Sequence, residues 1–288
     1  MKPTPVMFVR VVWLALPLAL VPALEGALAG RSSAVAVVVS MAGWLGWTTG
    51  IVAVLAPRTL GLTYLRIAAP ASLVLSSWAA LGDVSVGVAI AAVLLSAVAV
   101  VIVLSPAVTD AFVNGSAYGP ERRFALRTPA AILFGPALLV WVLIVAGAST
   151  GPLLLATEQW VAGGIALAIG WPIAAFAARS LHQLARRWLV FVPAGVVLHD
   201  PAAIASQLIP RSAVATIAPA LAGSDAHDLT GGAAGLALEV HLVDPIVIEP
   251  ARGRRNPPEP VETDRFLVSP SRPGAVMKEA RARRFAVA

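Results

Sequence analysis

The chain has 288 residues, of which 58% are hydrophobic and 12% are charged. Soluble domains are about 45–50% apolar and about 25% charged, so this composition excludes an ordinary soluble globule and predicts a membrane protein. The chain has no cysteine and carries 21 basic against 15 acidic residues, which excludes disulfides, thiolate metal sites and a cysteine nucleophile and leaves a net positive charge.

Apolar segments follow one another through the first 180 residues. About 20 residues are needed to cross roughly 30 Å of hydrocarbon, and six segments approach that length. The third and fourth are separated only by residues 82–85, which favours a tight hairpin, with a re-entrant pair as the alternative. The first segment also resembles a signal peptide that ends at Ala27-Leu28-Ala29. The predicted spans are 11–29, 34–56, 67–81, 84–104, 130–148 and 160–178.

Basic residues are concentrated in every second loop between the predicted spans. Loops rich in lysine and arginine stay in the cytoplasm, so both termini are predicted to be cytoplasmic in a multi-pass protein of the plasma membrane. The outer loops contain a single basic residue, Arg31. The predicted cytoplasmic segments contain ten: Lys2, Arg10, Arg58, Arg66, Arg122, Arg123, Arg127, Arg179, Arg186 and Arg187.

After residue 187 the pattern changes to strands. Residues 188–192 and 195–199 flank Pro193-Ala194-Gly195, which predicts a hairpin. Further strands are expected at 209–218, 236–242, 246–249 and 265–269, with a loop rich in proline and charge at 250–264. A helix should follow, with Val276, Met277, Ala280 and Phe285 on its apolar side. The predicted fold is an α-helical membrane bundle over residues 1–186 and a small cytoplasmic β-rich domain over 187–288, capped by a C-terminal helix.

The C-terminal part resembles a known family. Arg186-Arg187, the hairpin from Trp188 to Leu198, and a last helix after Ser-Pro-Ser-Arg-Pro273 resemble the bacterial pleckstrin-homology-like (PH-like) domains that follow transmembrane helices. The resemblance covers residues 186–288 and implies a bent sheet that acts in recognition rather than catalysis. Six spans precede the domain here instead of a pair, which leaves the family role open. The whole chain also resembles uncharacterised polytopic membrane proteins of high-GC Gram-positive bacteria, which implies no function.

Polar chemistry within the spans is sparse. None of the six predicted spans has an ionisable residue near its middle, which disfavours an ion-coupled transporter but not a pore for a neutral solute. Glycine and proline within the spans favour close helix packing, with discontinuous helices around a substrate as the alternative. His182, His199-Asp200, the run Asp225-Ala-His227-Asp228 and His241 are interpreted as surface or loop residues. No catalytic motif is present, so we expect no enzyme activity, no cofactor and no metal site.

The predicted function is that of a non-enzymatic interaction or assembly component acting through its cytoplasmic domain. The alternative is a carrier or channel for a neutral or lipidic substrate, and a lipid-modifying enzyme ranks third. Membrane lipids and a protein are the expected partners, and nucleic acid is not, because few aromatic side chains accompany the arginines. The loop 105–129 is expected to dock on the C-terminal domain or on another protein, with a disordered connector as the alternative. The candidate contact residues are Arg122, Arg123, Arg127, Arg186, Arg187, Arg254, Arg255, Arg283 and Arg284.

Overall fold

The computed structural model describes residues 4–201, 203–251 and 259–288, and the chain divides into two compact units. The helical unit comprises Met1–Gly115 and Leu138–His182, and the β unit comprises Ser116–Ala137 and Gln183–Ala288. The β unit therefore includes a segment from the middle of the chain, which lies inside the predicted membrane segment 1–186. As a result, the chain passes from one unit to the other three times.

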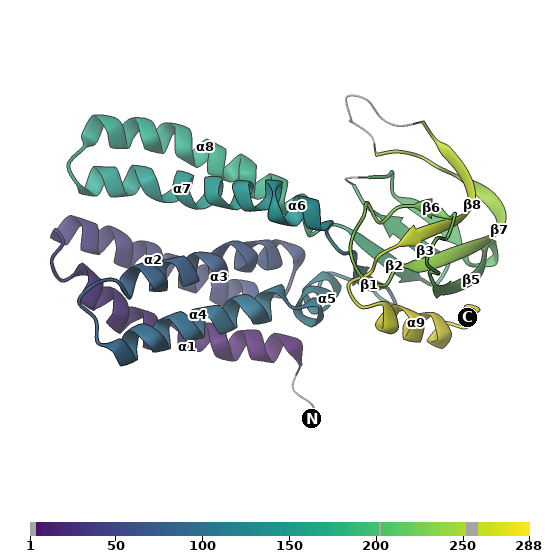
Figure 1. Cartoon of the computed structure of the whole chain (residues 1–288), viewed down its shortest axis with the longest axis horizontal. Helices are drawn as coiled ribbons and strands as arrows, with labels where there is room; N and C mark the ends of the chain where they lie inside the picture. Colours follow the sequence, from purple (N-terminus) through teal and green to yellow (C-terminus); the bar gives the residue numbers. More distant parts are fainter. Residues whose placement is uncertain (1–3, 202, 252–258) are drawn as a thin grey trace. The chain divides into compact units, whose positions relative to one another are not determined.

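Long apolar helices make up the helical unit (Figure 1). Within the described residues, six helical stretches are long and apolar enough to cross a membrane, with the short α6 and α7 forming one of them. The chain is a multi-pass membrane protein, as predicted. The helices are α1 (Pro5–Leu28), α2 (Ser33–Leu55), α3 (Thr59–Ala79), α4 (Val86–Leu104), α5 (Pro106–Asn114), α6 (Ala130–Phe134), α7 (Pro136–Ala156) and α8 (Trp160–Leu184).

Several helix boundaries differ from the prediction, and for two of them the structure gives the reason. Helix α3 begins at Thr59 rather than at residue 67. Arg66 was expected to lie in the loop before the helix, but it is within α3 and donates from Nη2 to Thr109 Oγ1 of α5 at 2.8 Å. The fifth span is interrupted at Gly135, and Pro136 then starts α7, a position that proline favours since its missing N–H is not needed there.

Helices α1 and α2 are held together by two tryptophans. Trp13 Nε1 donates to the carbonyl of Trp47 at 3.0 Å, and Trp47 Nε1 donates to the carbonyl of Trp13 at 2.8 Å. The Trp13 ring occupies the space beside Gly50, where an added Cβ would lie 2.1 Å from the ring. Arg10 Nε donates to the Val54 carbonyl in the last turn of α2. Trp13 is 3% exposed, so α1 is an integral part of the packing of the helical unit.

Helices α7 and α8 approach closely through glycine. A Cβ added at Gly147 would lie 2.6 Å from the Gly170 carbonyl oxygen, and one at Gly163 would lie 2.8 Å from Leu155. Small residues allow such backbone contact where lipid supplies no hydrophobic drive between helices. Close packing, rather than a discontinuous helix, therefore explains Gly163 and Gly170. Gly164 has nothing within 4 Å of its Cβ position.

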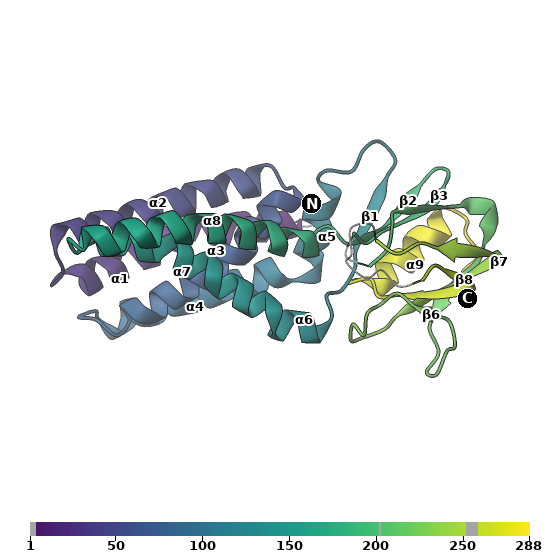
Figure 2. The ribbon, with the colours of Figure 1, turned by 90° about the horizontal axis from the view of Figure 1, so that it is seen from above.

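The β unit contains two four-stranded sheets and a C-terminal helix, α9 (Pro273–Ala282), which confirms the predicted class (Figure 2). The first sheet has the order β1-β2-β3-β4 and the second β5-β7-β8-β6. The strands are β1 (Arg122–Ala125), β2 (Trp188–Val192), β3 (Gly195–His199), β4 (Gln207–Pro210), β5 (Val214–Pro219), β6 (His227–Asp228), β7 (Leu238–Ile248) and β8 (Val261–Val268).

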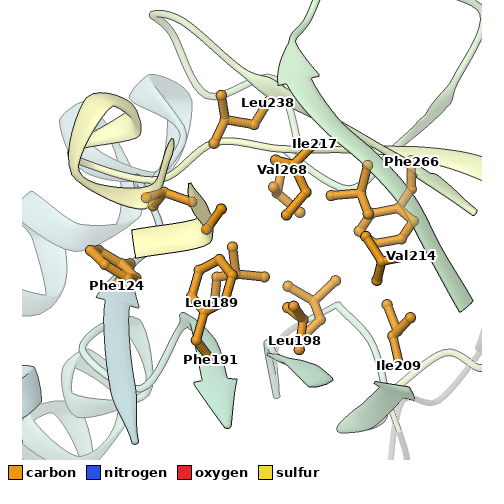
Figure 3. Packing of buried hydrophobic residues seen from close by; sticks show 14 of the residues in the cluster. Phe124, Leu189, Phe191, Leu198, Ile209, Val214, Ile217, Leu238, Phe266 and Val268 are labelled. Atoms are coloured by element: carbon orange, nitrogen blue, oxygen red, sulfur yellow. The ribbon is translucent and has the colours of Figure 1, made fainter. Parts of the chain in front are cut away.

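The two sheets face each other across one hydrophobic core (Figure 3). Phe124, Leu189, Phe191, Leu198 and Ile209 come from the first sheet, and Val214, Ile217, Leu238, Phe266 and Val268 come from the second. Leu189 and Phe191 of β2 and Val196 and Leu198 of β3 face this core at every second position, as the two-residue period of a strand requires. Helix α9 adds Val276, Met277 and Ala280, and Phe285 follows it into the same core.

Strand β1 joins the two sheets. It pairs with β2, and immediately after it Leu126 N–H donates to the Arg187 carbonyl at 3.0 Å. On the other side Arg127 N–H donates to the Ser269 carbonyl and Ser271 N–H donates to the Ala125 carbonyl, both at 2.7 Å. The loop predicted at 105–129 is thus a short helix, α5, followed by a strand that docks on the C-terminal residues, which was one of the two alternatives for it.

Two predicted strands differ in detail. Residues 209–218 form β4 and β5 with a 3-10 turn at Arg211–Ala213 between them, because Pro210 cannot donate and the chain changes sheets there. Residues 236–249 contribute one strand, β7, whose register shifts between His241 and Ile246, so Pro245 lies in an irregular stretch that a proline can occupy. The predicted loop 250–264 ends at Val261, where β8 begins, and its residues 252–258 lie outside the described part of the chain.

Candidate functional site

The predicted contact residue Arg187 is a structural residue. It is 5% exposed and its Nη2 lies 2.6 Å from Oδ2 of Asp200, which is 2% exposed. Its Nη1 also donates to the Arg127 carbonyl at 3.2 Å. A buried pair of this kind holds β2, the end of β3 and the segment after β1 together, and Arg187 is not available to a lipid or protein.

Four further predicted residues lie around β1 and the start of β2. Arg123 pairs with Glu121 at 2.9 Å and its guanidinium lies 5.3 Å from the centre of the Trp188 ring. Arg127 Nη1 donates to the Ala234 carbonyl at 2.7 Å. Arg122 is half-buried with its guanidinium over the Phe124 ring, and Arg186 is also half-buried. These arginines chiefly support the first sheet.

Arg283 and Arg284 lie at the end of α9. Arg283 pairs with Glu279 at 2.7 Å and also donates to the Pro120 carbonyl. Arg284 is exposed and its backbone is left-handed, with φ of 61°. Its carbonyl accepts a bond from Arg211 Nη2 at 2.8 Å. The remaining two predicted residues, Arg254 and Arg255, lie outside the described residues.

An exposed cluster of cations remains at α9, which we call the basic face. Lys278 and Arg281 are three residues apart on the outward side of α9, and Arg284 follows at its end beside Arg211. All four side chains are exposed. Among the described residues, none of the four has a carboxylate within ion-pair distance. The sequence prediction named Arg284 but not Arg211, since only the fold brings the turn after β4 beside the end of the C-terminal helix.

The polar residues considered for chemistry bind other parts of the β unit. His241 Nε2 lies 3.1 Å from Glu239, and Asp225 pairs with Arg265 at 3.0 Å. Asp228 accepts a bond from the Thr230 N–H at 2.7 Å, which closes a turn. Asp225 lies in a loop, as interpreted, whereas Asp228 and His241 belong to β6 and β7 and Asp200 is buried rather than solvated.

His199 is part of a stack on the outward side of the first sheet. Its ring lies 4.9 Å from the Trp188 ring with an interplanar angle of 18°, and Nδ1 bonds with Ser206 Oγ. Burial lowers the pKa of the imidazole, and the positive charges of Arg186 and Arg123 lower this pKa further, while Asp200 opposes them. The ring is therefore a neutral side chain that packs on tryptophan rather than a cation that recruits an anion.

Three tryptophans of the helical unit, Trp44, Trp47 and Trp171, have different surroundings. Trp47 bonds to α1, whereas Trp44 is 51% exposed and lines an open groove of about 610 Å³ with Ala36, Ser40, Met41 and Thr48. Trp171 is 53% exposed. The groove runs along α2 on the surface of a candidate span.

Sequence reasoning missed a group of polar side chains at the α5 end of the helical unit. Thr63 Oγ1 of α3 lies 2.8 Å from Nδ1 of His182 in α8, and Arg66 bonds to Thr109. Thr63 and Thr109 are 5% and 7% exposed. Residue Arg66 was placed in a loop because its charge was taken to end the apolar segment, so hydropathy gave no signal of this group.

Comparison with protein-family models, with curated proteins and with solved structures found no match to the chain. The fold and its surfaces define the class of protein directly. It is a multi-pass membrane protein with a β-rich unit that is assembled from two separate segments of the chain.

Proposed function

We propose that the protein is a non-enzymatic interaction or assembly component of the plasma membrane, and that its β unit is a PH-like recognition domain on the cytoplasmic side. Two sheets packed on one core and closed by a C-terminal helix support the PH-like assignment. The basic loops predicted from the sequence support the cytoplasmic orientation.

The observation that carries this proposal is the basic face. Lys278, Arg281, Arg284 and Arg211 repel one another when exposed together without acidic partners. Helix α9, which carries two of them and precedes Arg284, is anchored by Val276, Met277 and Ala280, so their backbone positions are defined before a partner binds. Three of the four are arginines, whose planar guanidinium pairs with a carboxylate through two parallel hydrogen bonds. The surface is therefore suited to an acidic face of a partner protein.

Charge reversal at Arg281 and Arg284 tests the proposal. The full chain would be purified in mild detergent from native membranes, alongside Arg281→Glu/Arg284→Glu and the charge-preserving control Arg281→Lys/Arg284→Lys. Mass spectrometry should find a stoichiometric protein with the wild type and the lysine variant, and its loss from the glutamate variant. A wild-type protein that purifies without any stoichiometric partner, or a partner that the glutamate variant retains, would overturn the proposal.

The alternative, a carrier or channel for a neutral or lipidic substrate, is favoured by one observation. The groove beside Trp44 is apolar except for Ser40 and Thr48. Its lining residues all belong to α2, which is one of the candidate membrane spans. Uptake of an apolar substrate into vesicles containing the purified chain, lost on Trp44→Ala, would support this function.

A further inference from the structure

Arg66 is a charged side chain within a candidate membrane span. It lies seven residues after the start of α3, about 10 Å along the helix axis. Its Nη2 donates to the Thr109 hydroxyl at 2.8 Å, and its Nε is buried without a hydrogen-bond partner. Among the described residues, no carboxylate lies within ion-pair distance of this guanidinium.

Such a charge is costly unless something compensates it. An arginine at the centre of a membrane helix costs about 2.5–3.5 kcal/mol, and ionisable residues inside spans are by default candidates for functional sites. The hydroxyl of Thr109 accepts one hydrogen bond but carries no negative charge. Within the described residues, Arg66 therefore lacks a directly paired anion rather than another polar neighbour.

The polar neighbours of Arg66 use their own protons in other hydrogen bonds. Thr63 lies three residues earlier and thus on the same side of α3. Its Oγ1 lies 2.8 Å from His182 Nδ1 and donates to the Thr59 carbonyl at 3.1 Å. Since the hydroxyl has a single proton, both bonds form when Nδ1 of His182 carries the proton and donates. Thr109 Oγ1 likewise donates its one proton to the Ser105 carbonyl at 3.0 Å, so of these groups the Arg66 guanidinium, with its unused N–H, is the donor left for an anion.

We propose that Arg66 binds the phosphodiester group of an anionic phospholipid, with Thr109 fixing the orientation of the guanidinium. The location favours a lipid over a free anion. Helix α3 is one of the candidate spans, and the polar headgroup layer occupies the outer 5–8 Å or so on each side of a bilayer. A guanidinium about 10 Å along the axis from the helix start lies close to this layer. The inference concerns the helical unit and does not depend on the basic face or on a protein partner.

Lipid-dependent stability of the full-length protein tests the site. The delipidated chain in detergent would be titrated with phosphatidylglycerol, phosphatidylcholine or inorganic phosphate, and the Tm and the lipid retained in native mass spectrometry would be measured. Phosphatidylglycerol should raise the Tm more than the other two. Arg66→Met should weaken its retention by about ten- to a hundredfold, the range expected for a charge-assisted hydrogen bond. Arg66→Lys should restore part of the retention.

Arg58→Met is the matched control, because Arg58 is exposed at the start of the same helix. It removes the same charge and should leave lipid retention unchanged. Arg66→Met should not lower the Tm of the delipidated protein, since it removes an uncompensated charge. Equal losses in both variants would assign lipid binding to general surface charge. Phosphatidylglycerol acting equally on wild type and Arg66→Met, or inorganic phosphate replacing the lipid, would also overturn the proposal.

Discussion

Two charged residues occupy backbone positions where glycine is usual. Arg284 and Glu158 have φ of 61° and 62°. Each follows a helix whose last carbonyls are satisfied in the same way: Phe285 N–H donates to the Ala280 carbonyl and Gln159 N–H donates to the Leu154 carbonyl. This is the Schellman arrangement, in which the left-handed residue is most often glycine because a Cβ is strained there. Arg284, one of the four residues of the basic face, is therefore a position of backbone strain.

Arg284→Gly should stabilise the β unit by about 0.5–1 kcal/mol, because glycine adopts the left-handed conformation without strain. Arg281→Gly is the control, since residue 281 is helical and glycine within a helix costs about 1 kcal/mol. Thermal unfolding followed by tryptophan fluorescence would measure both. A lower Tm for Arg284→Gly would show that its side chain contributes more than the strain costs.

The pKa of His199 predicts a pH dependence of stability. Because this pKa lies below that of the unfolded chain, about 6.5, the unfolded state binds more protons. The contribution is fully present above about pH 6.5 and is lost as the pH falls through the folded pKa. The Tm of the wild type should fall between pH 7 and pH 5 more steeply than that of His199→Phe, which keeps a ring against Trp188. Parallel curves would contradict this. The hydrogen bond from the Tyr118 N–H also lowers the pKa of Glu121 below 4.5. Glu121 therefore affects stability at a lower pH than His199 does.

Single residues were the least predictable part of the site. Nine arginines were expected to face lipid or a partner, yet Arg187 is buried against Asp200 and Arg283 pairs with Glu279. The identity of an arginine does not reveal whether a carboxylate distant in sequence will reach it. Conversely, Arg66 was assigned to a loop although α3 extends past it.

The contact between helices α7 and α8 depends on glycines, which have no side chain to keep the two backbones apart. Gly170→Ala should push the two helices apart, because its Cβ would lie 2.5 Å from the Gly147 carbonyl oxygen. Gly164→Ala, six residues earlier on the same helix, meets nothing within 4 Å and should leave the Tm unchanged or slightly higher. Thermal unfolding of both variants in detergent is the measurement. Equal effects would mean that the glycines matter for backbone flexibility rather than for contact.

Strand β1 should be essential to the β unit although it lies far in sequence from the other strands of that unit. Phe124 is 1% exposed and packs edge-to-face on Phe191, so Phe124→Ala should cost about 3–5 kcal/mol. Tyr118→Ala in the same segment changes a side chain that is 88% exposed and should cost less than about 0.5 kcal/mol. Protease resistance of residues 183–288 would report both. An intact β unit in Phe124→Ala would show that the C-terminal segment folds alone.

Elements whose sequence has a clear pattern of hydrophobic residues were predicted well, whereas β1 was not predicted. The spans follow from hydropathy, and the hairpin of β2 and β3 follows from alternating β-branched residues around a turn. Strand β1 consists of Arg-Arg-Phe-Ala, which is too short and too charged to show a strand pattern. Its conformation is imposed by pairing with β2, a contact between residues more than 60 positions apart in sequence.

For the whole molecule, the proposed orientation can be measured directly, because the chain has no cysteine to mask. Leu81 and Tyr118 are 87% and 88% exposed, and a cysteine introduced at either is open to a reagent. With the N-terminus cytoplasmic, a membrane-impermeant maleimide applied to intact cells should label Leu81→Cys and not Tyr118→Cys. The opposite labelling would invert the topology and place the basic face outside the cell.

The division of the β unit between two segments also sets an order of events during synthesis. Strand β1 leaves the ribosome before α7 and α8, and the last core residues follow roughly 10–30 s later at ordinary rates of synthesis. Pairing of β1 with β2 requires both to reach the same side of the bilayer, which fails if only one of α7 and α8 inserts. Such a chain would display Phe124 and its neighbours unpaired, so completion of the β unit marks those chains in which the last two spans entered the membrane together.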